Sequence, residues 1–270
     1  MRFVLKKHRV SKKEKTESAS ENRKRLLTQE TPFAIKEAYV KMRTNMMFCM
    51  TADGTRPCRT FGITSARPSE GKSLTAANIA ISCAMLGKRT LLIDADLRRP
   101  TQKHLWGVKI KYGLCDYLAQ IGPLEMVKTE QLPLWVICTG MIPPNPSEML
   151  SSDRMKWLLE EYSEMFDYVI IDTPPINTVA DAQIISALAD GMLVVAKSGV
   201  STLDEIDEAV ETVRSAGGNF CGVILNDMNL KSAKYSYRSK YGSQYGYKYG
   251  YKYSYKYGYG GEYGSKHQNT

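Results

Sequence analysis

Residues 59–86 read RTFGITSARPSEGKSLTAANIAISCAML, a short apolar segment that passes through a polar loop into a helical pattern. The apolar residues of 59–64 are typical of a buried strand, and those of 72–86 recur at helical spacing. The loop between them ends in Gly-Lys-Ser at 71–73, where the helix begins. Backbone N–H groups at such a helix start bind phosphate. The segment therefore predicts a phosphate-binding loop, although Gly-Lys-Ser alone is also compatible with a plain helix start.

The alternation of strand and helix extends along the chain in both directions. Further strands are expected at 89–94, 134–138, 168–172, 191–196 and 220–225, and further helices at 33–50, 113–120, 147–164, 181–189 and 203–216. Strands that alternate with helices form right-handed crossovers and a buried parallel sheet. The expected fold class is therefore α/β, a mostly parallel sheet with helices on both faces.

Composition separates the two ends of the chain from this body. Residues 1–25 hold ten Lys and Arg against three acidic residues, and residues 231–270 hold eight against one. Twelve of the 17 tyrosines lie in the last 40 residues, where aliphatic residues are almost absent. Segments of this kind do not form a core. We expect a basic disordered segment over 1–30, a folded domain over 31–230 and a disordered tyrosine-rich tail over 231–270.

The charge and cysteine content exclude several classes of protein. No apolar run approaches the roughly 18 residues of a membrane span, and the basic N-terminus lacks the apolar stretch of a secretory signal. Six scattered cysteines without metal-ligand spacing are typical of reduced thiols in the cytoplasm. Basic arms can contact nucleic acid or anionic lipid. The body between them carries more acidic than basic residues, so no nucleic-acid partner is expected.

The loop supplies six candidate nucleotide-binding residues. They are Ser69, Glu70, Gly71, Lys72, Ser73 and Leu74. In a phosphate-binding loop Lys72 would reach the β- and γ-phosphates, and the Ser73 hydroxyl would bind Mg²⁺. The loop is poor in glycine, since Ala66 stands where the strict pattern has one.

Two other strand ends carry carboxylates. LLIDADLRRP at 91–100 places Asp94 and Asp96 two residues apart on an extended segment, so both side chains point the same way. YVIIDTPP at 168–175 delivers Asp172 to the carboxyl edge of the sheet, where ligands of open α/β folds bind. Each segment alone is also compatible with a polar turn or a helix cap. Together with the loop they predict a nucleotide site at which carboxylates support Mg²⁺.

These segments resemble the Walker A, A′ and B motifs of bacterial tyrosine kinases, the BY-kinases of capsule and exopolysaccharide operons. The matching residues are 66–73, Asp94-x-Asp96-x-Arg98-x-Pro100 and Asp172-Thr173-Pro174. The resemblance implies a P-loop NTPase-like fold, ATP and Mg²⁺ as cofactors, and phosphate transfer to tyrosine. It implies that Ser73, Asp96 and Asp172 support the metal. It further implies that Lys72 and Asp94 are catalytic, with Asp94 orienting or deprotonating the acceptor hydroxyl.

The tail fits this resemblance as a substrate. The expected phosphoacceptors are Tyr235, Tyr237, Tyr241, Tyr245, Tyr247, Tyr249, Tyr251, Tyr253, Tyr255, Tyr257, Tyr259 and Tyr263. A phenol has a pKa near ~10, so it needs a carboxylate that accepts its proton during transfer. Alternating tyrosines are also compatible with a self-associating strand or with stacking on single-stranded nucleic acid.

The family resemblance extends to assembly and partners. Family members often carry Glu-x-x-Arg-x-x-Arg on a helix that mediates a ring, and this chain has Glu37 and Arg43 but Val40 in place of the middle arginine. The resemblance implies a homo-oligomeric ring, a membrane-embedded activator of the polysaccharide co-polymerase type, and a cognate phosphotyrosine phosphatase. The kinase would be cytoplasmic, recruited to the inner face of the cell membrane, and would regulate capsular or exopolysaccharide synthesis and export.

Two other functions stay open at this point. A Min- or Par-type dimerising ATPase has a similar fold, but it carries a signature lysine where this chain has Arg67, and it does not end in a tyrosine cluster. A nucleotide-gated adaptor that another kinase phosphorylates is the alternative without catalysis. Incubation of the purified protein with labelled ATP distinguishes the three.

Overall fold

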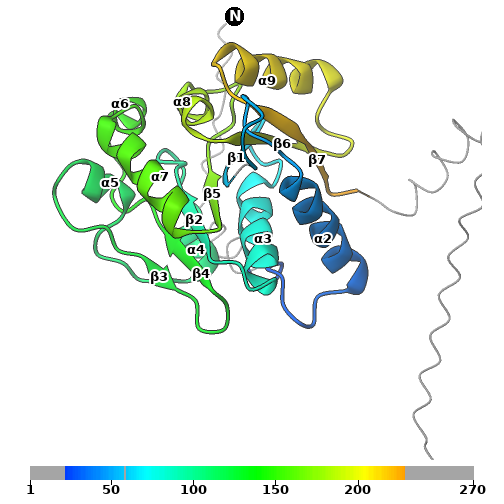
Figure 1. Ribbon diagram of the computed structural model, residues 1–270, viewed down its shortest axis with the longest axis horizontal. Coiled ribbons are helices and arrows are strands. Elements are labelled where there is room, and N and C mark those ends of the chain that lie inside the picture. The colour runs from blue at the N-terminus through cyan, green and yellow to red at the C-terminus, as the bar shows by residue number, and fades with distance from the viewer. Residues whose placement is uncertain (1–21, 58, 229–270) are drawn as a thin grey trace, which may run out of the picture. The chain divides into compact units, whose positions relative to one another are not determined.

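A seven-stranded sheet forms the centre of the protein in a computed structural model that describes residues 22–57 and 59–228 (Figure 1). Its strands are β1 (Thr60–Ser65), β2 (Thr90–Asp94), β3 (Val127–Lys128), β4 (Leu134–Ile137), β5 (Tyr168–Asp172), β6 (Gly191–Lys197) and β7 (Phe220–Asn226). All neighbouring strands are parallel except the short β3, which runs antiparallel to β4. The mostly parallel sheet expected from the sequence is confirmed.

The strand order positions the three motif segments. The order is β3-β4-β2-β5-β1-β6-β7, so β5 lies between β2 and β1. Asp94 at the end of β2 pairs in register with Asp172 at the end of β5. The carboxyl end of β1, where the phosphate loop begins, lies on the other side of β5. Parallel strands end at the same edge of a sheet, so all three segments meet there.

Helices cover both faces of the sheet. They are α2 (Phe33–Met47), α3 (Lys72–Met85), α4 (Gln102–Trp106), α5 (Leu114–Leu118), α6 (Pro146–Leu150), α7 (Asp153–Met165), α8 (Asp181–Leu188) and α9 (Leu203–Ser215). Alternate side chains of a strand point to opposite faces. Leu92 packs in a core with α2, α3 and α4, whereas Leu91 and Ile93 pack against α5, α6 and α7 on the other face. On that second face α8 and α9 cover β6.

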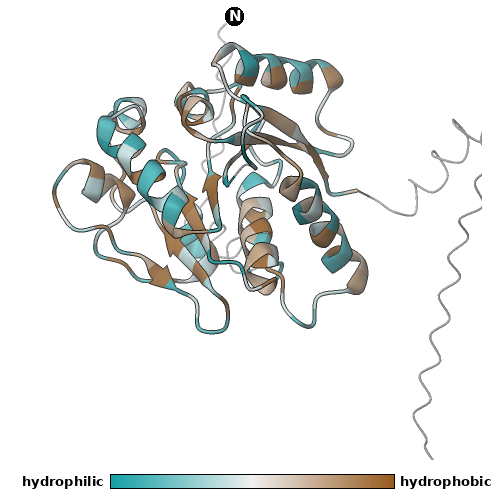
Figure 2. Ribbon diagram, in the orientation of Figure 1, coloured by the Kyte–Doolittle hydropathy of each residue, from teal (hydrophilic) through white to brown (hydrophobic). Residues whose placement is uncertain are grey.

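The hydropathy of the elements follows this layering. Figure 2 shows predominantly apolar strands, and helices whose surfaces alternate between polar and apolar residues. Within the described ranges, none of the helices combines the length and the apolar character needed to cross a bilayer.

The sequence predicts one helix over 147–164, whereas the structure has two in this region. α6 ends at Leu150 and α7 begins at Asp153. Between them, Ser152 is the N-cap of α7, and its side chain accepts a hydrogen bond from the N–H of Met155 at 3.3 Å. Serine at this position stabilises a new helix start, an effect that apolar periodicity does not reveal. The short elements α4 and β3 were not expected either.

Part of the basic N-terminal segment is ordered. Leu27 is buried in the core that contains α3, and its N–H donates to Asn78 Oδ1 at 2.8 Å. Asn78 Nδ2 donates in turn to the carbonyl of Arg25 at 3.1 Å. The disorder expected over 1–30 therefore does not hold for 22–30, because a buried leucine and an amide anchor this stretch. Residues 1–21 lie outside the described part of the chain.

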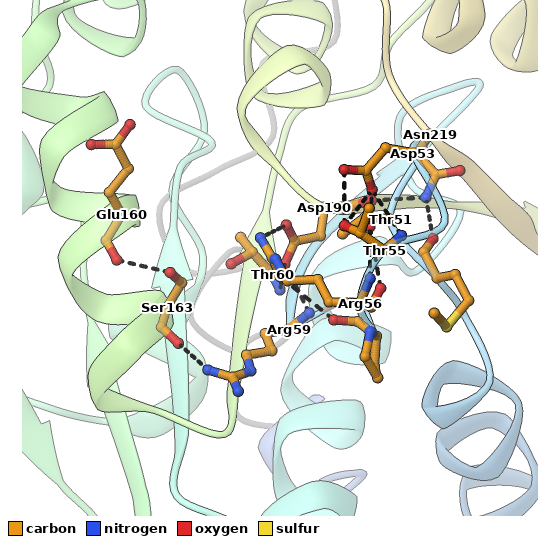
Figure 3. A network of polar contacts seen from close by, with 12 residues as sticks. Thr51, Asp53, Thr55, Arg56, Arg59, Thr60, Glu160, Ser163, Asp190 and Asn219 are labelled. Carbon is orange, nitrogen blue, oxygen red and sulfur yellow. Dashed lines mark hydrogen bonds and ion pairs between the residues drawn. The ribbon is translucent and has the colours of Figure 1, made fainter.

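A polar network fixes the start of β1 at the edge opposite the phosphate loop (Figure 3). Asp190, just before β6, accepts two hydrogen bonds from the Arg56 guanidinium at 2.7 and 3.0 Å. It also accepts the backbone N–H groups of Arg59 and Thr60 at 2.8 and 3.0 Å. Burial opposes ionisation, but these donors outweigh it and lower the Asp190 pKa. The network thus ties β1, which leads into the phosphate loop, to the neighbouring β6.

Candidate active site

The phosphate loop spans residues 66–71, between β1 and the first residue of α3, Lys72. Ser69 and Gly71 adopt left-handed backbone conformations, with φ of 68° and 89°. Two features favour glycine at 71. A side chain would be strained at this φ, and its Cβ would collide with the Asn226 amide. The turn therefore depends on this single glycine, even though the loop has fewer glycines than the strict pattern.

Contacts from other elements hold the loop in place. Glu70 is buried, and its carboxylate accepts the Arg67 N–H at 2.9 Å and the Ser201 hydroxyl. Asn226, the last residue of β7, donates its Nδ2 to the carbonyl of Glu70 at 2.9 Å. The loop is thus fixed from the β6–α9 connection and from β7. The contacts of Ser201 and Asn226 with Glu70 were not foreseen from the sequence, because each joins residues more than 100 positions apart.

The Lys72 ammonium lies among the carboxylates of the site. Its Nζ is 2.8 Å from Asp96 Oδ2 and 3.4 Å from Asp172 Oδ1, and it donates to the Ser73 hydroxyl at 3.2 Å. Lys72 is 8% exposed. Burial favours the neutral amine, but Asp172 and Asp96 outweigh it and raise the pKa of Lys72. The lysine is therefore a buried cation that compensates two acidic side chains.

Asp94 is the third carboxylate of the site. It is fully buried, and its Oδ2 accepts the N–H groups of Thr101 and Gln102 at 3.1 and 2.9 Å. Burial, and then the neighbouring Asp172, raise the pKa of Asp94 well above its ordinary value. Its second oxygen, Oδ1, is buried without a hydrogen-bond partner among residues 22–57 and 59–228. An orphaned carboxylate oxygen beside other carboxylates is an atom suited to a proton or a cation.

The site fits a magnesium ion that arrives with phosphates. Asp94, Asp96 and Asp172 converge, and the Lys72 ammonium provides the positive charge among them. The described side chains form no cluster of three or more His, Cys, Asp or Glu arranged to hold a metal by themselves. Mg²⁺ usually binds through one or two carboxylates plus substrate phosphates. Ser73, Asp96 and Asp172 are the residues that would hold it.

The remaining predicted loop residues differ in what they can contribute. Ser69 is exposed, so both its backbone and its hydroxyl can reach a ligand. Glu70 and Leu74 face inward, Leu74 against the core, and only their backbone groups are available for phosphate. Arg98 of the A′ segment binds Asp181 at the start of α8 through two hydrogen bonds of 2.8 and 3.0 Å.

The two residues predicted to mediate self-assembly lie on α2. Arg43 turns inward and donates to the carbonyl of Ser82 on α3 at 2.6 Å. Glu37 is half-buried and makes no ion pair with any residue in the described ranges. Arg43 thus contributes to packing within one chain, and its predicted role in a ring stays a prediction. The predicted phosphoacceptors, Tyr235 to Tyr263, lie outside the described residues.

Comparison with known proteins places these observations in a family. Residues 58–257 match the ParA family model, described as NUBPL iron-transfer P-loop NTPase. The chain is 41% identical over 204 residues to tyrosine-protein kinase YwqD of Bacillus subtilis, with 74% of this chain and 85% of that protein covered. It is 37% identical over 206 residues to tyrosine-protein kinase etk of Escherichia coli, with 74% of this chain but only 28% of that longer protein covered.

A solved structure agrees with the sequence relatives. The crystal structure of the chimerical protein CapA2B2 is 34% identical, with a TM-score of 0.69, 74% of this chain and 88% of that chain covered. Fold and site together define a P-loop NTPase whose nucleotide site lies at the carboxyl edge of a parallel sheet. Within that class, the chain belongs to the bacterial tyrosine-protein kinases. At the level of the family it is a nucleotide-binding transferase.

Proposed function

We propose that this chain transfers the γ-phosphoryl group of ATP to protein tyrosines, its own C-terminal cluster among them. The observation that carries the proposal is the convergence of Lys72 with Asp96 and Asp172, at 2.8 and 3.4 Å, beside the phosphate loop. Phosphoryl transfer depends mainly on alignment and on neutralisation of phosphate charge. An ammonium, a hydroxyl and carboxylates at one strand edge provide the groups for both.

The side chains of the loop have distinct parts in the proposed reaction. Phosphate oxygens compete with Asp96 and Asp172 for the Lys72 ammonium, so the lysine turns from the carboxylates to the phosphates when nucleotide enters. The two carboxylates and the Ser73 hydroxyl then become available as metal ligands. Mg²⁺, when bound, would neutralise charge on the phosphates. The loop N–H groups orient the phosphates without moving, because Glu70 and Asn226 already fix the loop.

Asp94 is the proposed acceptor of the phenol proton. Its raised pKa makes it a better match for a tyrosine hydroxyl than an ordinary carboxylate. Its orphaned Oδ1 is the free atom, since Oδ2 is held by two backbone N–H groups. Because Asp94 has no exposed surface, the hydroxyl reaches it only after the site opens. Displacement of Lys72 by nucleotide is the opening that this proposal requires.

The tail and the partners complete the proposal. Residues 231–270 contain 12 tyrosines and, fully extended at ~3.3 Å per residue, reach up to about 130 Å. The proposed kinase also needs a partner that brings it to the membrane. We assign this part to a membrane-embedded activator of the polysaccharide co-polymerase type that recruits the cytoplasmic kinase to the inner membrane face. A homo-oligomeric ring and a phosphotyrosine phosphatase would complete a cycle that regulates capsular or exopolysaccharide synthesis and export.

The test is phosphate transfer by the purified full chain with labelled ATP and Mg²⁺. We expect phosphotyrosine in the tail by mass spectrometry, and its loss in the variants Lys72→Met, Asp94→Ala and Asp172→Ala. Asp96→Asn should lower the rate by about 100-fold, as removal of one preorganised charged group does. Asp204→Asn, at an exposed position of α9, is the matched control and should leave the rate unchanged.

Other outcomes identify other functions. Free phosphate without phosphotyrosine would indicate a dimerising ATPase of the Min or Par type. Bound nucleotide without either product, in the presence of the activator, would indicate an adaptor. A Lys72→Met variant that phosphorylates its tail at the normal rate would refute the proposed mechanism.

A further inference from the structure

Gln102 contacts all three motif segments of the site. It is the first residue of α4, six residues after Asp96, and it is fully buried. Its backbone N–H donates to Asp94 Oδ2 at 2.9 Å. Its side-chain Nε2 donates to the carbonyl of Ser73 at 3.0 Å and to Asp172 Oδ2 at 2.8 Å. The Gln102 side chain thus joins the Walker A segment to the end of β5, and its backbone N–H adds a contact with the A′ segment.

The orientation of the Gln102 amide follows from its neighbours. Trp106, one turn later on α4, points its indole N–H at Gln102 Oε1 at 3.1 Å. An indole nitrogen is a donor only, so it must face the amide oxygen. The amide nitrogen then faces two acceptors, the Ser73 carbonyl and the Asp172 carboxylate, and uses both of its hydrogens. The opposite orientation would lose all three hydrogen bonds, so Trp106 fixes which way the amide points.

This orientation distinguishes the two oxygens of Asp172. Oδ2 is occupied by the Gln102 amide, and Oδ1 is left toward the Lys72 ammonium at 3.4 Å. The same amide holds the Ser73 backbone, whose side-chain hydroxyl lies 3.2 Å from Lys72 Nζ. Asp172 and Ser73, two of the residues that would hold the metal, are therefore held in position by the neutral Gln102 amide. An uncharged donor of this kind neither repels a cation nor competes for one.

We infer that Gln102 is a positioning residue for the metal site, and that Trp106 sets its orientation; this rests on the nucleotide–Mg²⁺ site of the proposed function. Gln102 aims Asp172 Oδ1 and the Ser73 hydroxyl at the cation position without touching the cation. Residues that orient metal ligands typically change metal affinity by about 10- to 100-fold when they are removed. A residue that only fills space would affect nucleotide binding equally with and without metal.

Two variants separate these roles. Gln102→Met keeps the length of the side chain and removes its hydrogen bonds. Trp106→Phe keeps an aromatic ring and removes only the donor that orients the amide. Trp135→Phe is the matched control, because Trp135 is a half-buried indole on β4, packed against Phe166 in a different core. It measures what the loss of an indole costs where no metal ligand is involved.

The readout is binding of the non-hydrolysable analogue AMP-PNP to the full chain, by calorimetry, with Mg²⁺ and with EDTA. The Mg²⁺-dependent gain in affinity is the ratio of the AMP-PNP affinity in Mg²⁺ to that in EDTA. We expect Gln102→Met to reduce this ratio about 10-fold. Trp106→Phe, which loses one neutral hydrogen bond, should reduce it about threefold. Trp135→Phe should leave the gain unchanged, and affinity in EDTA should be the same in all variants.

Each other result overturns the inference. An unchanged Mg²⁺-dependent gain in Gln102→Met and Trp106→Phe would show that the amide does not position the ligands. An equal loss of affinity in Mg²⁺ and in EDTA would show a merely structural role. If Gln102→Met does not fold, as judged by circular dichroism, the test rests on Trp106→Phe and Trp135→Phe. Equal Mg²⁺-dependent gains in affinity in these two variants would then overturn the inference. Phosphotyrosine formation by the unmodified chain is measured separately, so its absence would refute the proposed kinase activity without affecting this binding result.

Discussion

Replacement of Lys72 by methionine should destabilise the nucleotide-free protein, and by an amount that depends on pH. The ammonium is 2.8 Å from Asp96 and 3.4 Å from Asp172, and Asp172 is fully buried. Removing one member of a buried ion pair costs about 3–5 kcal/mol, because it leaves an uncompensated charge. We therefore expect the free energy of unfolding to fall by about 3 kcal/mol at pH 8.

The decrease in the free energy of unfolding should become smaller as the pH falls, because a carboxylate without its cationic partner can take up a proton. Burial already raises the pKa of Asp172, and without the opposing Lys72 ammonium its folded-state pKa rises further above its unfolded value. Stability is then retained at low pH and lost as pH rises through the folded-state pKa. Protonation costs about 1.4 kcal/mol for each pH unit above the ordinary pKa of 3.8. At pH 5 the deficit should therefore be no more than about 1.6 kcal/mol.

Urea unfolding of the metal-free and nucleotide-free protein in EDTA, followed by circular dichroism, measures both values. Lys156→Met is the control, since Lys156 is an exposed lysine of α7, and it should change the stability little at either pH. A deficit of the same size at pH 5 and pH 8, or none at pH 8, would contradict the view that Lys72 compensates buried carboxylates.

Three further outcomes follow from the site. Asp94→Asn should raise the stability by about 1 kcal/mol at pH 7 in urea unfolding while abolishing tail phosphorylation, because a folded-state pKa above the unfolded value makes the charged form costly as pH rises. Gly71→Ala should lower the melting temperature and weaken AMP-PNP binding about 10-fold, since φ is 89° and the added Cβ collides with Asn226; unchanged binding would show that the loop tolerates a different turn. Incubation with Mg-ATP should remove the net positive charge of residues 231–270 after about four or five phosphates, each adding about −1.5 to −2 charges. Intact mass paired with cation-exchange retention of the released tail checks this, and unaltered retention at five phosphates would contradict it.

The sequence predicted what depends on local pattern. Apolar runs marked the six longer strands, and their alternation with helices implied that Asp94, Asp172 and the phosphate loop would share one edge. The short β3 was missed because a two-residue strand leaves no periodic signal. The break between α6 and α7 was missed because apolar spacing continues through Ser152.

Features that depend on contacts between distant segments were not predictable in this way. The direction of the Gln102 amide depends on Trp106 together with two acceptors on other elements. The inward turn of Arg43 depends on a free carbonyl at Ser82 of α3. The orphaned oxygen of Asp94 reflects which donors happen to reach it. Sequence spacing identifies residue types for a site but not how each atom is partnered.

The hydrogen bond from Asn226 to Glu70 has a consequence for the tyrosine cluster. Asn226 holds the nucleotide loop at 2.9 Å, and the first tail tyrosine follows only nine residues later along the chain. Nine residues of chain span at most about 30 Å, which sets an upper limit on the distance between Asn226 and that tyrosine. This upper limit grows by ~3.3 Å with each further residue toward Tyr263. For the proposed substrate tail, covalent length alone would thus rank the twelve tyrosines by the farthest acceptor site that each could reach.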